Sequence, residues 1–488
     1  MAQRLQMAPV FDHIDRHQPQ HLDRLLELIR VPSISAENRG MTECAELLAS
    51  YYRGLGCQRV EIVPTKGQPV VYAEYRAGKP VTLLVYFMYD VKQITGEEWT
   101  LVRDPFDPQV VERSPFRRCL VGRGAVNQKG PLGAFLNAVE SIRATGQELP
   151  VNLKFISDGE EEIGSPRLVD FATAYVDRLR DAQAAIFPTA SQNLKGVPMV
   201  ALGCKGSAPF ELECSGALWG RGPRRFDIHS SNAAMVDHPA WRLIQALATM
   251  TDPAHPDRIT IDDFYDDVLP PAADDVALVD RMAPNYDEES AKQVLAVDRF
   301  IDDVHGRDAL MKLFFAPTLN IQGIVGGYIG PDFKTSMPHR VRAKFECRLV
   351  PNQTYRGVLD KVRRHLDRRG YPDIQIVAVR GGRSVEDARS HEWARTSPTS
   401  PFVEALVRSC RQRGAEPLIA PTNAGSAPWH VFTKRPLQIP LLPVGLNHGG
   451  RAHSPDEYLV IEGNDQVKGL AEFEKSFVAA LDEMAAVG

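Results

Sequence analysis

The chain has 488 residues, 43% hydrophobic and 24% charged, a composition typical of soluble globular proteins and a length that favours two domains. Its net charge of −5 argues against a nucleic-acid-binding surface, which would need an excess of basic residues. Residues 1–20 lack the apolar core of a signal peptide, and no run approaches the ~18 apolar residues of a membrane span. Seven scattered cysteines indicate reduced thiols. We therefore expect a cytoplasmic protein without membrane partners.

Helical and strand-like patterns alternate through the first part of the chain. Helices are predicted at 21–35, 41–56, 129–146 and 166–179, and strands at 59–64, 69–75, 81–87 and 151–158. Such alternation predicts an α/β domain with a mostly parallel, mixed sheet flanked by helices. Functional groups in such domains gather at the carboxyl ends of the strands.

The pattern changes near residue 207. A strand-like run begins there, and it is followed by a helix at 238–251, a strand at 339–351, a helix at 354–370 and a strand at 373–382. The α/β pattern then resumes with a helix at 401–414, a strand at 437–446 and a helix at 464–486. We therefore expect a catalytic-type α/β domain of residues 1–206 and 383–488, and an inserted α+β lid domain of residues 207–382.

Three stretches carry candidate chemistry. "GRGAVNQKG" (122–130) is Gly-rich but lacks the P-loop spacing, and by itself it is also compatible with a tight turn before a helix. "DGEEEIGS" (158–165) places three glutamates at a strand end, where crowded carboxylates need a cation or a shared proton. "GLNHGGRAHSPDEY" (445–458) brings two histidines, His448 and His453, after another strand.

Together these motifs resemble the ArgE/DapE/carnosinase/carboxypeptidase-G family of di-zinc peptidases and amidohydrolases, in particular its carnosinase-type dipeptidases. The resemblance covers nearly the whole length and includes "LLVYFMYDV", "GRGAVNQKGPLGAF", "DGEEEIGS", "DIHSS", "FECRLVPNQ", "AGSAPWHVF" and "RAHSPDEY". It implies a catalytic domain with an inserted lid, a homodimer formed through that lid, and two zinc ions that activate a water molecule.

The five zinc-ligand positions of the family fall on Met88, Asn127, Glu162, Thr189 and His453. Zinc sites use thiolate, imidazole or carboxylate ligands, so Met88, Asn127 and Thr189 cannot do this work. We therefore expect a degraded metal site and no cofactor. The alternative is a weak site for a single divalent metal such as Zn on Glu162 and His453.

The resemblance assigns roles to further residues. It makes Glu161 the general base, Asp90 the residue that orients the missing first histidine, and His229 a lid residue that reaches across the dimer. Arg348 would hold a substrate carboxylate, a task that suits its planar fork of donors. Gly425 and Ser426 match the substrate-binding loop. The five former ligand positions would line the substrate pocket.

Three functions remain open at this point. The first is a metal-independent enzyme that acts on an amino-acid-, dipeptide- or N-acyl-amino-acid-like substrate, with Glu161 as general acid/base. The second is a single-metal peptidase or amidohydrolase that recruits His448 or Asp90 as a further ligand. The third is a non-catalytic binding protein that keeps the pocket and the dimer.

Overall fold

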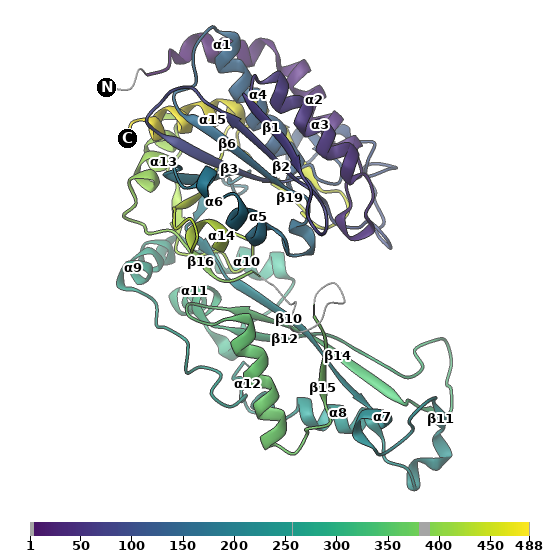
Figure 1. The fold of residues 1–488 in the computed structure, drawn as a ribbon. Coiled ribbons are helices and arrows are strands. Elements are labelled where there is room, and N and C mark those ends of the chain that lie inside the picture. The colour runs from purple at the N-terminus through teal and green to yellow at the C-terminus, as the bar shows by residue number, and fades with distance from the viewer. Residues whose placement is uncertain (1–3, 256, 380–390, 488) are drawn as a thin grey trace. The chain divides into compact units, whose positions relative to one another are not determined.

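The computed structural model describes residues 4–255, 257–379 and 391–487, and the chain forms two compact units (Figure 1). The α/β unit comprises Met1–Gly203, Ala394–Thr422 and Pro428–Gly488, and the insert unit comprises Cys204–Trp393 and Asn423–Ala427. The expected domain division at 206/207 stays a prediction. Its second boundary, at 382/383, lies outside the described residues.

The helices of the α/β unit are α1 (Met7–Arg16), α2 (Gln18–Arg30), α3 (Met41–Gly54), α4 (Lys129–Ala144), α5 (Leu168–Ala174), α6 (Val176–Leu179), α13 (Pro401–Gln412), α14 (His430–Thr433) and α15 (Leu470–Ala485). Its strands are β1 (Arg59–Val63), β2 (Val70–Tyr75), β3 (Thr82–Met88), β4 (Gln109–Arg113), β5 (Phe116–Val121), β6 (Asn152–Asp158), β7 (Ala184–Pro188), β8 (Met199–Ala201), β16 (Ala394–Arg395), β17 (Leu418–Ala420), β18 (Leu441–Val444), β19 (Gly449–Gly450) and β20 (Tyr458–Glu462). β9 (Gly203–Cys204) lies where the chain passes from this unit to the other.

A six-stranded sheet with the order β1-β2-β6-β3-β7-β18 forms the centre of this unit (Figure 1). The pairs β3–β6, β3–β7 and β7–β18 are parallel, whereas β1 and β2 are antiparallel additions at one edge. Adjacent residues of β3 face opposite sides: the Phe87 ring packs edge-on against Phe135 of α4, and the Tyr86 ring packs against Phe432 of α14. The predicted mixed, mostly parallel sheet with helices on both faces is confirmed.

The site residues follow from the register of this sheet. Met88 at the end of β3 pairs with Asp158 at the end of the parallel strand β6. β7 is the other neighbour of β3 and ends at Pro188, directly before Thr189. Because carboxyl ends of parallel strands meet at one edge of a sheet, the loops after these three strands leave the sheet at the same edge.

The insert unit contains α7 (Gly216–Trp219), α8 (Pro239–Leu247), α9 (Ala273–Met282), α10 (Glu288–Leu295), α11 (Gly306–Phe315), α12 (Tyr355–Arg368), β10 (Gly206–Ser215), β11 (Ile228–His229), β12 (Thr318–Val325), β13 (Ser336–Met337), β14 (Arg340–Leu349) and β15 (Gln375–Val379). Its antiparallel sheet has the order β12-β14-β10-β15. Phe210 and Phe345 stack at 5.0 Å in a core that also takes residues from α8 and α12. The predicted α+β character of this region is confirmed.

Several predicted elements differ in extent from the structure, among them a helix and a strand of the α/β unit. The helix expected at 166–179 is two short helices, α5 and α6, which are separated at Tyr175, where the backbone leaves the helical region (φ −101°, ψ 9°). The strand expected at 437–446 is only β18 (Leu441–Val444). The Pro at 440 precedes that strand, and proline has no N–H to donate to a sheet, which limits pairing before Leu441.

Candidate functional site

Asp90 holds the turn that carries the paired glutamates. Its Oδ1 accepts the backbone N–H of Glu161 at 3.1 Å, and its Oδ2 accepts the backbone N–H of Glu162 at 3.0 Å and the hydroxyl of Ser35 at 2.6 Å. Asp90 is fully buried, and the family resemblance places Met88 at the position of the histidine that it would orient. The observed contacts make Asp90 a backbone anchor for the glutamate turn.

Gln128 ties together the ends of β3 and β7. Its side-chain oxygen accepts the backbone N–H of Met88 at 3.1 Å, and its amide nitrogen donates to the backbone carbonyl of Pro188 at 2.6 Å. Since Asn127 precedes Gln128 and Thr189 follows Pro188, one buried side chain brings three of the predicted positions into one neighbourhood. Sequence reasoning missed Gln128, although it lies inside the "GRGAVNQKG" motif.

Glu457 anchors the loop that carries Asn127. One carboxylate oxygen accepts the backbone N–H groups of Val126 at 3.1 Å and Asn127 at 2.9 Å, and the other accepts from Arg123 at 2.9 Å. Arg123 and Glu457 are both almost fully buried, so this ion pair is shielded from water. The segment that carries His453 is thereby fastened to the Asn127 loop, a role that sequence reasoning did not assign to Glu457.

Asn127, Glu162 and His453 meet at the centre of the site. The amide nitrogen of Asn127 lies 2.9 Å from Glu162 Oε1 and 2.8 Å from His453 Nε2. His453 Nε2 is also 3.0 Å from the same carboxylate oxygen. The structure thus brings together three of the five former ligand positions as one direct hydrogen-bonded network.

Lys92 completes this network from the loop after β3. Its ammonium lies 3.1 Å from Glu162 Oε2 and donates to the backbone carbonyl of Glu162 at 2.6 Å. Both carboxylate oxygens of Glu162 are therefore bound by donors from the chain itself. Lys92 was not singled out from the sequence, although its place two residues after Asp90 in "MYDVK" was a usable signal.

The two adjacent glutamates are electrostatically different. Burial raises the pKa of Glu162, but the contacts with His453 and Lys92 outweigh it and hold the pKa of Glu162 below the usual glutamate value. Burial, followed by the nearby charges of Glu162 and Asp90, raises the pKa of Glu161 well above its usual range. The Glu161 carboxylate has no hydrogen-bond or ion-pair partner among the residues described, so it is available to a ligand.

These residues do not fit a pair of zinc ions. Of the five positions that the family resemblance assigns to zinc ligands, only Glu162 and His453 carry ligand types that zinc prefers, and an NH₂ group of Asn127 lies against both of them. Within the described ranges, no group of three or more His, Cys, Asp or Glu residues is arranged to hold a metal. We therefore assign no catalytic step to a metal.

The residues suggested as extra ligands are already engaged. The ring nitrogens of His448 lie 2.7 Å from the carbonyl oxygen of Gln192 and 2.9 Å from the hydroxyl of Tyr458. Both oxygens of Asp90 bind the glutamate turn. A single-metal site that recruits either of them would first have to break these bonds.

Arg348 and Ser426 meet in the insert unit. Arg348 lies on β14, and its guanidinium donates to the Ser426 hydroxyl at 2.9 Å and lies 3.2 Å from the Glu346 carboxylate. Gly425 is held in the same short loop by a bond from its backbone N–H to the Asn423 side chain at 2.8 Å. These three predicted substrate-binding positions form one polar cluster.

His229 lies elsewhere in the insert unit, on β11. Its Nδ1 is 2.8 Å from the hydroxyl of Ser231, and its Nε2 is 3.2 Å from that of Thr335. The imidazole is exposed, as a residue that serves another chain would be. Its expected role across a dimer stays a prediction.

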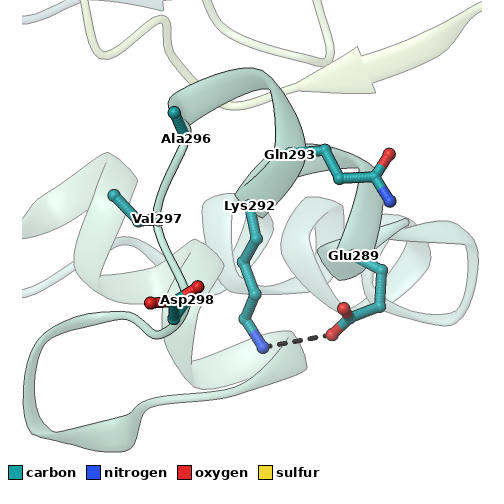
Figure 2. Close-up of a pocket in the computed structure, with 6 residues that line it drawn as sticks. All are labelled: Glu289, Lys292, Gln293, Ala296, Val297 and Asp298. Atoms are coloured by element: carbon teal, nitrogen blue, oxygen red, sulfur yellow. Dashed lines mark hydrogen bonds and ion pairs between the residues drawn. The ribbon is translucent and has the colours of Figure 1, made fainter.

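A cavity of about 340 Å³ lies beside α10 in the insert unit (Figure 2). It is lined by Glu289, Lys292, Gln293, Ala296, Val297 and Asp298. Its lysine, Lys292, is already paired with Glu288 at 2.8 Å and with Glu289 at 3.1 Å. The cavity contains none of the predicted site residues, so we do not assign the chemistry to it.

Comparison with known proteins decides the family. Residues 85–479 match the family model for Peptidase family M20/M25/M40. The chain belongs to this family. This M20 protein is 30% identical over 384 residues to human Beta-Ala-His dipeptidase, which covers 74% of the chain and 71% of that protein. It is 26% identical over 504 residues to the Cys-Gly metallodipeptidase dug1 of Schizosaccharomyces pombe, with 99% of each chain covered.

Solved structures agree with this assignment. The M20 family metallo-carboxypeptidase Sso-CP2 from Sulfolobus solfataricus superimposes with a TM-score of 0.81 at 30% identity, over 95% of this chain and 98% of that one. Human carnosine dipeptidase 1 gives a TM-score of 0.77 at 26% identity, over 98% and 100%. The predicted family, its carnosinase-like branch and an enzyme of the peptidase class are confirmed. The names of the metallopeptidase relatives give no support to a metal-independent reaction.

Proposed function

We propose that this M20 protein acts on a dipeptide or a related amino-acid or N-acyl-amino-acid substrate, with Glu161 as general acid/base and without a divalent metal. The dipeptidase names of its relatives support the substrate class. The contact of the Asn127 amide with both Glu162 and His453 supports the metal-free site, because a donor group lies where ligands would face a cation.

The absence of a metal would limit the chemistry. Zinc lowers the pKa of bound water from about 15.7 to about 7, and a single glutamate cannot replace this effect on an ordinary amide. Proton transfer, cyclisation, elimination, acyl transfer or hydrolysis of an activated bond remain within reach of one positioned carboxyl group. Glu161 suits this role because it is half-buried and is held through its backbone by Asp90.

Two further features belong to the proposal. β12 is an edge strand, and its side chains Ile321, Ile324 and Val325 are 47%, 51% and 52% exposed, which supports a homodimer through the insert unit. None of the seven cysteines, all of which lie in the described residues, forms a disulfide, which supports a cytoplasmic location. No helix in the described part of the chain is long and apolar enough to cross a membrane.

The experiment combines metal analysis with turnover. Protein purified without chelator is analysed for zinc, and a panel of dipeptides and N-acyl amino acids is then tested with and without EDTA. We expect sub-stoichiometric zinc and product formation that EDTA does not change. Glu161→Gln should abolish this turnover, while Glu160→Gln, the neighbouring glutamate in the same turn, should retain it.

Other outcomes would identify the alternatives. Two equivalents of zinc per chain would refute the metal-free site. Turnover lost in EDTA and restored by one equivalent of zinc would identify a single-metal hydrolase. Ligand binding without turnover, unchanged by Glu161→Gln, would identify a binding protein.

A further inference from the structure

Glu162 is a buried carboxylate whose charge is compensated within the chain. Its side chain is only 3% exposed, and isolated charges at such depth are strongly disfavoured unless they are paired and hydrogen-bonded. Lys92 contacts Oε2 and the backbone carbonyl of this same residue, while Asn127 and His453 contact Oε1. Lys92 thus brings a positive charge to the Oε2 side of this carboxylate.

The same contacts oppose the entry of a divalent ion. A zinc ion on Glu162 would bind its oxygen at about 2.0–2.2 Å, which places it close to an ammonium that already lies 3.1 Å from that carboxylate. Like charges this close repel, and because Lys92 is only 26% exposed, water screens this repulsion only in part. The neutral Asn127 adds no negative charge to offset the repulsion.

We propose that Lys92 is a built-in replacement for the metal cations, which neutralises Glu162 and keeps divalent ions out of the site. Lys92 is therefore a positioning residue: it holds the Glu162 turn in a shape that needs no metal. The inference rests on the proposed metal-free site, but zinc binding is measured without turnover, so a catalytically silent protein would leave it standing.

The test measures zinc affinity by competition with a chromophoric chelator. The proteins compared are wild type, Lys92→Met, Asn127→Asp and the double variant Lys92→Met/Asn127→Asp. We expect negligible binding by wild type, and zinc binding by the double variant at least about tenfold tighter than by Asn127→Asp alone, because the ammonium is gone. Zinc should raise the Tm of the double variant more than that of Asn127→Asp.

Two controls separate charge from loss of packing. Lys92→Arg/Asn127→Asp keeps the positive charge and should bind zinc as poorly as Asn127→Asp. Lys312→Met, introduced into the Asn127→Asp protein, removes a lysine of similar exposure (27%, against 26% for Lys92) that pairs with Asp257 at 2.6 Å. It should leave the zinc affinity of Asn127→Asp unchanged. If Lys92→Met does not fold, Lys92→Gln takes its place in both variants.

If Asn127→Asp and Lys92→Met/Asn127→Asp bind zinc with equal affinity, the proposed role of Lys92 is wrong, while the proposed metal-free site of the wild-type protein is unaffected. Stoichiometric zinc in the wild-type protein, lost in His453→Gln, would overturn this role together with the metal-free site.

Discussion

The Asp90 carboxylate accepts the backbone N–H of Glu162 at 3.0 Å, and it accepts that of Glu161 as well. A residue that the family resemblance pairs with a metal-binding histidine therefore positions the two glutamates through their backbone. The bond between Asp90 and Glu162 holds this turn without any contribution from Met88, the residue at the position that the resemblance gives to the histidine.

Asp90→Asn should destabilise the glutamate turn. The amide keeps one acceptor but places an NH₂ group against a backbone donor, so a buried N–H loses its partner. We expect the free energy of unfolding in urea to fall by about 1–3 kcal/mol. Asp177→Asn, at an exposed carboxylate, is the control and should change it by less than about 0.5 kcal/mol. Equal stability of the two variants would contradict the anchoring role.

Glu457→Gln should lower the free energy of unfolding more than Asp90→Asn does. The substitution removes the negative charge that faces the buried Arg123 while keeping the size of the side chain. Breaking a buried pair by removing one partner costs about 3–5 kcal/mol, here reduced to the extent that Glu97 also neutralises Arg123. The control is Arg180→Gln, which removes one partner of an exposed ion pair, and both variants are unfolded in urea. If Glu457→Gln lowers the free energy of unfolding no more than Arg180→Gln does, Glu457 is not a buried anchor.

Lys205 predicts a pH dependence of stability. Burial, followed by the nearby Arg348, lowers the pKa of Lys205 to about 8, below the ordinary lysine value of 10.5. Between pH ~8 and ~10.5, Lys205 is more protonated in the unfolded chain than in the folded one, so its contribution to the free energy of unfolding rises with pH. The unfolding free energy of wild type relative to Lys205→Met should increase by at most about 3 kcal/mol from pH ~7.5 to ~10.5. A difference that stays constant, or falls, would exclude the lowered pKa.

Arg348→Lys tests the proposed recognition of a substrate carboxylate. Lysine keeps the charge but loses the planar fork and its bond to Ser426. We expect KM for a dipeptide with a free carboxylate to rise about 10- to 100-fold, and KM for its carboxamide analogue to change little. Arg340→Lys, on the same strand but 51% exposed, is the matched control. An equal change for both substrates would point to a structural role for Arg348.

His229 can be tested by mixing two inactive variants. If it acts on the site of the partner chain, a heterodimer of Glu161→Gln and His229→Ala contains one site in which both residues are intact. Random exchange of subunits should then restore activity to about a quarter of the wild-type level, because half of the dimers are mixed and each has one working site. Activity that does not recover, in dimers shown to exchange, would contradict action in trans.

Much of the architecture could be predicted from local pattern. The helix at 129–146 and the strands at 81–87 and 151–158 were predicted within two residues of α4, β3 and β6, because apolar periodicity records which face each element buries. The helix at 166–179 was not predicted correctly, because it breaks at Tyr175, whose ring packs against Tyr72 of β2 and Phe171 of α5. Helix α1 was also missed.

The sequence by itself determined the family and the layered fold, since ordered motifs can be read without coordinates, and its residue chemistry predicts that three zinc-ligand types are replaced. Only the tertiary structure decided what stands in their place. Lys92 and Glu162 are 70 residues apart, and Asn127 and His453 are 326 apart. Contacts over such separations depend on which strand ends meet at one edge of the sheet, and local sequence does not encode this pairing directly. The charge balance of the site therefore became visible only when these loops were brought together.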